Sequence, residues 1–279
     1  MNTHEWRVGG RLSFTVEESA RLVLQVAPAT TAGNVLDERL DVTVDGRSVD
    51  GLREHRTARG GRSHVFTARP GDLVIDYAST LHAWWHGTTV APTDGAEELD
   101  AIVALRQSRY CESDRLAGFA ASEFTELLPD DAYGTAVTVS SWVFERLTYI
   151  GGVSGPLDSA VDTLLAGEGV CRDFAHLTIA LCRALRIPAR LASVYAPGIS
   201  PMDFHAVAEV FVAGTWYVLD STRLAPRSEL VRIATGRDAA DTAFATVLDG
   251  RAELVDAEVF ASSRVDLAED DHRQRVTLP

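Results

Sequence analysis

Apolar and polar residues alternate through the first third of the chain. Five runs have apolar residues at alternate positions: Leu12–Val16, Leu22–Val26, Leu40–Val44, Val65–Ala68 and Leu73–Tyr77. Pro28, Asp45-Gly46 and Pro70-Gly71 follow or separate them. A period of two indicates strands with one buried face, and the interrupting residues favour turns. We therefore expect residues 1–95 to form an antiparallel, sandwich-like β-domain at the N-terminus.

The period changes to that of helices after a proline- and acid-rich segment, residues 91–98, which is the expected linker. Apolar residues then recur at intervals of three and four, the spacing of a helix with one buried face. The pattern predicts four helices: Ser113–Phe124, Gly134–Tyr149, Pro156–Gly167 and an apolar helix that begins near Cys171 and ends before Pro188.

Strands return after this last helix. They are predicted at Leu191–Tyr195, Phe204–Val212 and Thr215–Asp220. If Val212 pairs with Thr215 across the short turn, His205 and Asp220 are diagonal neighbours on one sheet face, with backbones about 7–8 Å apart. A slip of one residue would put them on opposite faces, so this inference depends on the turn.

The C-terminal part contains strand-like runs at 244–248 and 253–260, then a charged segment from Asp266 that is expected to fray. The fold class is therefore α+β. An N-terminal antiparallel β-domain, residues 1–95, precedes a unit over 96–279 in which helices pack on an antiparallel sheet. The core of that unit is expected at about 110–245.

Cys171 is the first candidate for chemistry. It follows Gly169-Val170 and opens the apolar helix, where the free N–H groups and the partial positive charge of a helix N-terminus favour a thiolate. His205 is a base that can take the thiol proton, and Asp220 can fix its tautomer. The Cys171 N–H is a suitable oxyanion donor; Trp142 and Tyr149 are candidates for the second.

Several other polar residues have simpler interpretations. Cys111 and Cys182 are expected in the core, and Asp173 and His176 on the surface or supporting the site. Arg237, Asp238 and Asp241 form either a charge cluster lining the cleft or a surface loop. His82 and His86 have the spacing of a zinc pair, but the glutamate of that motif is absent, so we expect neither metal nor cofactor.

Charge and composition narrow the classes of function. The net charge of −14 disfavours nucleic acid as a partner, and every basic side chain is arginine. No apolar run reaches the length of a membrane span, and the first residues lack the apolar core of a secretory signal. We therefore expect a cytoplasmic protein without a membrane partner, and its three cysteines contain no C-x-x-C pair.

Three sequence blocks resemble those of bacterial transglutaminase-like proteins, in the papain-like cysteine-protease superfamily. They are G-V-C-R-D-F-A-H-L, D-F-H-A-V-A-E-V-F and G-T-W-Y-V-L-D-S-T, and R-I-A-T-G-R-D-A-A-D is similar to the C-terminal part of that family. The resemblance implies a papain-like, transglutaminase-like core. It implies Cys171 as nucleophile, His205 as base and Asp220 as orienting acid. Ser221 departs from the family, in which proline often follows the aspartate.

The resemblance implies a reaction type: a thioester forms from a peptide or glutamine-type amide, and its acyl group passes to water or an amine. Hydrolysis by a protease or amidase is favoured, because nothing marks a lysine-donor site. A peptide or protein substrate is the expected partner, and the oligomeric state is open. The alternatives are a non-catalytic scaffold that keeps the fold and an assembly factor that holds a peptide tail in the cleft.

Overall fold

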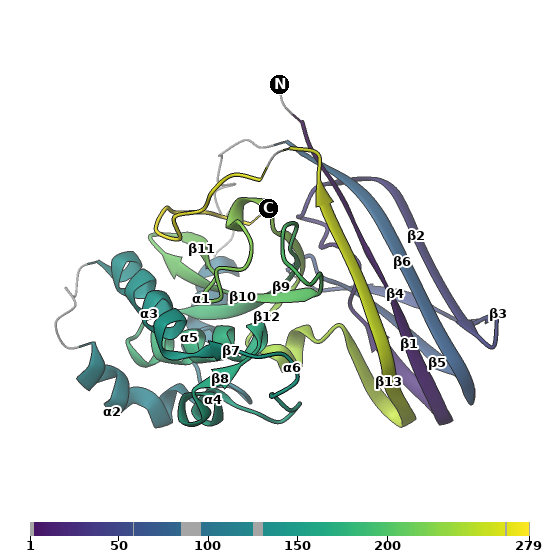
Figure 1. Cartoon of the computed structure of the whole chain (residues 1–279), viewed down its shortest axis with the longest axis horizontal. Coiled ribbons are helices and arrows are strands. Elements are labelled where there is room, and N and C mark those ends of the chain that lie inside the picture. Colours follow the sequence, from purple (N-terminus) through teal and green to yellow (C-terminus); the bar gives the residue numbers. More distant parts are fainter. Residues whose placement is uncertain (1–2, 58, 85–95, 125–130, 266, 279) are drawn as a thin grey trace.

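The computed structural model describes residues 3–57, 59–84, 96–124, 131–265 and 267–278 of the 279-residue chain. Its class is α+β, as predicted (Figure 1). The N-terminal strands are β1 (Thr3–Leu24), β2 (Asn34–Val44), β3 (Arg47–Ser48), β4 (Arg53–Arg56), β5 (Arg62–Ala68) and β6 (Gly71–Trp84).

These strands form one curled antiparallel sheet instead of two facing sheets, with the order β3-β2-β6-β1-β5-β4. The sequence predicted two strands where β1 is one strand of 22 residues. The polar segment Glu17-Glu18-Ser19 between the two predicted strands stays extended and absorbs register shifts on both sides of Glu18. Such bulges increase the local twist of a sheet, which favours its curling.

A seventh strand, β13 (Ala245–Ser263), joins this sheet from the far end of the chain and pairs with β1 from Trp6 to Leu24. The sequence predicted two shorter strands here and assigned both to the C-terminal unit. Their true partner is the first strand, which alternation alone cannot identify. The boundary near residue 95 falls among residues outside the described part, so it stays a prediction.

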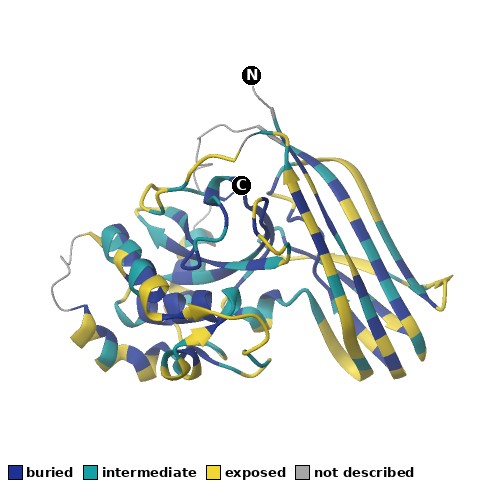
Figure 2. Cartoon of the chain, viewed as in Figure 1, coloured by how far each residue is buried: buried dark blue, intermediate teal, exposed yellow. Residues whose placement is uncertain are grey.

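One face of the N-terminal sheet packs on the C-terminal half of the chain. Figure 2 shows buried and exposed residues alternating along its strands. The buried face of β1, from Trp6 to Leu24, shares one apolar core with Tyr195, Val231 and Ile233. The Tyr195 hydroxyl donates to the Val26 carbonyl at 2.7 Å. The two halves of the chain are therefore joined by a dry, hydrogen-bonded contact.

The C-terminal half contains the helices and a four-stranded antiparallel sheet with the order β11-β10-β9-β12. Its helices are α1 (Ala96–Val103), α2 (Ser113–Glu123), α3 (Ala132–Arg146), α4 (Ala160–Ala166), α5 (Cys171–Ala184) and α6 (Ala239–Thr242). Its strands are β7 (Thr148–Tyr149), β8 (Glu168–Gly169), β9 (Ala189–Tyr195), β10 (Phe204–Val212), β11 (Thr215–Leu219) and β12 (Val231–Gly236).

Two predicted helices are shorter than expected. The third begins at Ala160, because Ser159 caps it by accepting from the Asp162 N–H, whereas Pro156 lies outside it. The second ends at Arg146, and Thr148–Tyr149 then pairs with β8 in a short parallel ladder. The expected linker is also shorter, since α1 already begins at Ala96.

Helix α5 is the central element of this half. Its residues from Asp173 to Arg183 are all buried, and it contacts α2, α3 and α4 as well as β9 and β10. Leu177, Ile179 and Leu181 are fully buried, and burial of each such side chain contributes about 1.5–3 kcal/mol. The helix is therefore fixed on every side, and its first residue, Cys171, is held in a defined position.

The C-terminal segment 267–278 is tied down, which corrects the expectation that it frays. Asp270 forms a two-pronged ion pair with Arg227, a fully buried arginine, at 2.8 Å for both contacts. The Val218 N–H of β11, an outer strand of its sheet, donates to the Val276 carbonyl at 2.9 Å. Composition suggested a solvated tail because ion-pair partners far apart in sequence leave no local pattern.

Candidate active site

Cys171 is the first residue of α5 and is partly exposed. The turn before it is fixed by Asp173, which is buried and accepts from the Val170 N–H at 2.9 Å. Gly169 makes this approach possible, since a Cβ there would lie 2.7 Å from the Asp173 Cβ. Gly169, two residues before the cysteine, thus leaves room for the Asp173 side chain that caps α5. Asp173 supports the site and does not face solvent.

Gly169→Ala is expected to lower the free energy of unfolding by about 1–3 kcal/mol, the usual cost of overpacking. Urea unfolding at neutral pH measures it. The matched control is Gly118→Ala in α2, where a Cβ meets nothing within 4 Å. That variant should be neutral or up to about 1 kcal/mol more stable, because alanine favours a helix. Equal stabilities for the two variants would contradict this account of Gly169.

The hairpin of β10 and β11 has the predicted register: Val212 pairs with Thr215 and Ala208 with Leu219. This register puts the side chains of His205 and Asp220 together, with His205 Nε2 2.9 Å from Asp220 Oδ2. Both residues are only 1% exposed. The contact is therefore shielded from water, where an imidazole–carboxylate interaction is strongest.

The remaining ring nitrogen of His205, Nδ1, is buried and has no hydrogen-bond partner within the described part of the chain. Burial opposes the charged ring, but the Asp220 carboxylate and then the Cys171 thiol outweigh it and hold the pKa of His205 well above its ordinary value. The Cys171 Sγ lies 3.9 Å from the carbonyl oxygen of Phe204, the neighbour of His205. Thiol, imidazole and carboxylate thus come together in that order.

The Asp220 carboxylate is fully satisfied. Its second oxygen accepts from the Thr222 N–H at 2.9 Å and from the Thr222 hydroxyl at 2.7 Å. Burial would raise the pKa of Asp220, but His205 and Thr222 together lower it below its usual range. Ser221 points to a buried hydroxyl cluster instead, 2.6 Å from Thr178 Oγ1. Serine at this position therefore anchors the aspartate segment to α5.

Tyr149, and not Trp142, lies beside the cysteine. The Trp142 indole N–H is used by Glu123 at 2.8 Å, and its ring packs on Phe119. The Tyr149 hydroxyl accepts from the Cys171 N–H, and partial burial together with the nearby Cys171 raises the pKa of Tyr149 to about 12. The phenol is therefore a hydrogen-bond donor at neutral pH, next to the nucleophile candidate.

The other candidate residues lie away from this site. Cys111 and Cys182 are fully buried, and burial raises the pKa of each thiol to about 12. His176 is buried too; its Nε2 accepts from the Ala239 N–H, and burial lowers its pKa to about 3. These three residues are part of the packing around α5, as expected for the two cysteines.

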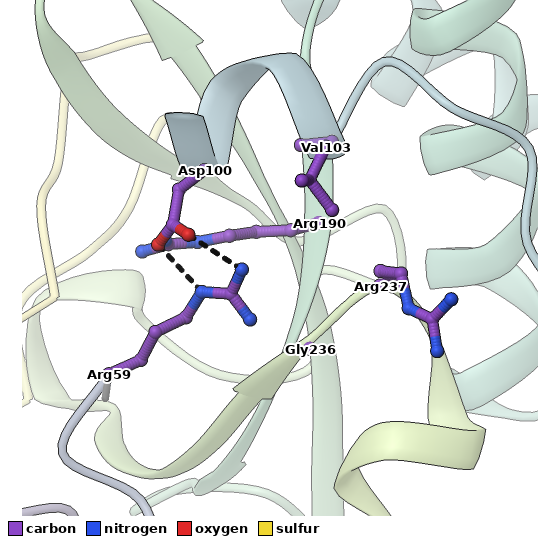
Figure 3. Close-up of a pocket in the computed structure, with 7 residues that line it drawn as sticks. Arg59, Asp100, Val103, Arg190, Gly236 and Arg237 are labelled. Atoms are coloured by element: carbon purple, nitrogen blue, oxygen red, sulfur yellow. Dashed lines mark hydrogen bonds and ion pairs between the residues drawn. The ribbon is translucent and has the colours of Figure 1, made fainter. Parts of the chain in front are cut away.

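The charged segment after β12 makes contacts of its own. Arg237 forms an ion pair with Asp241, and Asp238 accepts from the Tyr110 N–H at 3.0 Å. Arg237 also lines a small pocket, where Arg59 and Asp100 form a two-pronged ion pair at 2.7 and 2.8 Å (Figure 3). Arg237, Asp241, Arg59 and Asp100 each have an oppositely charged partner, so the pocket is a structural contact.

No group of three or more histidine, cysteine, aspartate or glutamate side chains suited to a metal occurs within the described ranges. His82 Nε2 donates to the Glu5 carboxylate at 2.8 Å, whereas His86 lies outside the described residues. In the same part of the chain, no helix is both long and apolar enough to cross a membrane.

Comparison with known proteins agrees with this geometry. Residues 120–221, which include the cysteine, histidine and aspartate, match the transglutaminase-like superfamily. The crystal structure of a candidate cysteine protease from Cytophaga hutchinsonii is 32% identical, with a TM-score of 0.84, over 100% of this chain and 96% of that chain. The chain belongs to the transglutaminase-like superfamily. Its fold and its membership are therefore as the sequence blocks predicted.

Two further relatives are more distant. An uncharacterized protein of Mycobacterium leprae is 30% identical over 118 residues, which are 38% of this chain and 41% of that protein. The match thus spans less than half of the mycobacterial relative. The periplasmic domain of TgpA from Pseudomonas aeruginosa is 17% identical, with a TM-score of 0.40, over 78% of this chain and 90% of that chain.

Two features of this transglutaminase-like site were not predicted. Arg172 holds the glycine-rich loop after β7 by donating to Asp173 and to the Gly155 carbonyl at 2.7 Å. Asp203 precedes β10 and stands beside the histidine. Both residues occur in the quoted sequence blocks, but their role depends on contacts that no spacing rule describes.

Proposed function

We propose that the protein is a cysteine hydrolase that cleaves a peptide or glutamine-type amide through a thioester on Cys171. Membership of the transglutaminase-like superfamily and similarity to a candidate cysteine protease support a cysteine-protease-like enzyme. The single observation that carries the proposal is the arrangement of His205. Its Nε2 binds Asp220, and its unpartnered, buried Nδ1 is the nitrogen left for the thiol.

The reaction has two steps. In the first, the Cys171 proton passes to His205 Nδ1 and the thiolate attacks the amide carbonyl carbon. The C–N bond breaks, and His205 returns the proton to the leaving amine. In the second step, His205 takes a proton from water, and the hydroxide attacks the thioester and releases a carboxylic acid and the thiol. Asp220 remains a carboxylate throughout and stabilises the imidazolium.

The oxyanion of each tetrahedral intermediate needs two donors. The Cys171 N–H is one, and we propose the Tyr149 hydroxyl as the second. In the free protein this hydroxyl accepts from the Cys171 N–H, so the two groups are already adjacent. Because the pKa of Tyr149 is raised to about 12, the phenol keeps its proton at neutral pH. The substrate oxygen would replace the phenol as acceptor of the Cys171 N–H.

The test is alkylation of Cys171 by iodoacetamide between pH 5 and 9, followed by mass spectrometry. An ordinary thiol, with a pKa of about 8.5, is almost fully protonated at pH 6 and reacts slowly. We expect wild-type Cys171 to keep at least about a tenth of its maximal rate at pH 6, and His205→Ala to lower that rate by about 10-fold or more.

Cys171→Ala is the control for site assignment, because Cys111 and Cys182 are buried and should remain unlabelled in the folded protein. The ion-pair mechanism would be overturned if wild-type Cys171 were labelled with the pH dependence of an ordinary thiol and if His205→Ala left this pH dependence unchanged. The cytoplasmic location and the peptide nature of the substrate stay predictions, and cell fractionation and substrate screening test them separately.

A further inference from the structure

Asp203 is a neighbour of the thiol site. It immediately precedes Phe204, whose carbonyl oxygen is 3.9 Å from the Cys171 Sγ. Its side chain is exposed, and Oδ1 accepts from the Phe204 N–H at 2.7 Å. This hydrogen bond fixes the direction of the carboxylate. The group is therefore both accessible and held in one orientation beside the nucleophile.

Asp203 forms no ion pair within the described part of the protein, although the His205 ring lies within electrostatic range of its carboxylate. The nearest cation on α5, Arg172, is engaged by Asp173 and the Gly155 carbonyl. An accessible carboxylate that is fixed but unpaired favours the binding of a cation from outside the chain.

The same charge reaches the reacting groups. The Asp203 carboxylate contributes to the raised pKa of Tyr149, and the ring of His205 counteracts the rise in the pKa of Asp203 that partial burial causes. Asp203 therefore lies within electrostatic range of the groups on both sides of the thiol. A charged part of a substrate in this cleft would interact with it.

We propose that Asp203 is a specificity-determining residue that selects a cationic group next to the amide. This inference rests on the proposed function of the site. The group that Asp203 selects carries a positive charge. It is either an arginine or lysine side chain of the acyl donor, or the ammonium group of a diamine that accepts the acyl group.

A purely structural role predicts a different result. If Asp203 only anchors the start of β10, the amide oxygen of asparagine can accept from the Phe204 N–H as well, so Asp203→Asn should change nothing. If the charge matters, Asp203→Asn keeps the hydrogen bond and removes the selectivity. The variant therefore separates the charge from the anchor.

The first experiment needs no substrate. Cys171 is alkylated at pH 7 with neutral iodoacetamide, anionic iodoacetate and cationic 2-bromoethylamine. The alkylation rate with each charged reagent is divided by the rate with iodoacetamide, which gives an iodoacetate ratio and a bromoethylamine ratio. We expect Asp203→Asn to raise the iodoacetate ratio by about 3–10-fold and to lower the bromoethylamine ratio similarly at low salt. The control is Asp114→Asn, an exposed acid on α2 that causes the same change in net charge.

Ratios in Asp203→Asn that equal those in Asp114→Asn would overturn the proposal. This failure is distinct from failure of the proposed function, because the ratios do not depend on the absolute reactivity of the thiol. A wild-type Cys171 that reacts like an ordinary thiol would reject the hydrolase, whatever the ratios are.

A second experiment separates the two sources of the cation. Peptide amides with arginine or its neutral isostere citrulline beside the scissile bond are compared, with and without 1,4-diaminobutane. A preference for arginine that Asp203→Asn loses assigns the charge to the acyl donor. Formation of a diamine adduct that Asp203→Asn loses assigns it to the acceptor. Absence of both effects in an active enzyme would overturn the proposal.

Discussion

Cys171→Ala is expected to abolish amide cleavage, with a loss in kcat of about 10⁶-fold, as for other enzymes that act through a nucleophile and a base as one unit. The reason is that no other thiol can replace it. Cys182 is on the same helix but fully buried, and burial raises its pKa to about 12. The measurement is turnover of any peptidyl coumarin amide that the wild type cleaves.

The fold should survive this substitution. Cys171 is partly exposed and its side chain is small, so the unfolding free energy should change by less than about 0.5–1 kcal/mol. Cys182→Ala is the matched control and should remain active while losing stability through its cavity. Cleavage that persists in Cys171→Ala at a tenth of the wild-type rate would exclude the thioester.

Glu209→Gln is expected to cost about 3–5 kcal/mol of stability at pH 7. Glu209 is fully buried on β10, four residues after His205, between Arg190 and Arg232. Its two oxygens accept from Arg232 at 2.7 and 2.8 Å, and Arg190 donates at 2.9 Å. A neutral amide would remove the buried negative charge that both arginines share, although Arg190 also has a further acid, Asp100, at 3.9 Å. Urea unfolding at pH 7 measures the loss.

The effect should depend on pH. Although burial acts in the opposite direction, the two arginines lower the pKa of Glu209 to about 2. Glu209 therefore contributes its full stabilisation of the fold at pH values above the ordinary pKa of a glutamate in the unfolded chain, about 4.3. This stabilisation is lost as the pH falls towards 2. The difference between wild type and Glu209→Gln should shrink below pH 4.

Asp76→Asn is the control for this prediction, because Asp76 forms an ion pair with Arg11 on the surface. Exposed pairs of this kind contribute about 0–1 kcal/mol. A cost for Glu209→Gln no larger than that of Asp76→Asn would contradict the description of this cluster as a buried anchor for β10.

The site was more predictable than the sheet that supports it. His205 and Asp220 belong to one hairpin, so a short turn and a period of two were enough to bring them together. Cys171 was recognisable because a glycine and a helix start surround it. These are local patterns, and local patterns can be extracted from a single chain.

Contacts between distant segments were not predictable in this way. Strand β12 received no strand prediction, because Val231–Gly236 is buried on both faces yet contains Arg232 and Thr235, so neither alternation nor a continuous apolar run marks it. The sequence left open whether Trp142 or Tyr149 is the second oxyanion donor, because the position of Tyr149 beside Cys171 depends on the parallel pairing of β7 and β8. The anchoring of the C-terminal segment depends on Arg227 meeting Asp270. Each of these contacts is tertiary.

The pairing of β1 with β13 has a consequence for synthesis of the chain. Trp6 lies opposite Ser263, and Leu24 opposite Ala245. One edge of β1 therefore stays unpaired until β13, near the C-terminal end of the chain, has been synthesised. Ladders between such distant segments close slowly, and an unpaired edge invites association with other chains. The N-terminal sheet cannot finish folding on the ribosome before the transglutaminase-like unit has emerged. Chains that stall after residue 244 would carry an intact cysteine–histidine–aspartate set beside an aggregation-prone open edge.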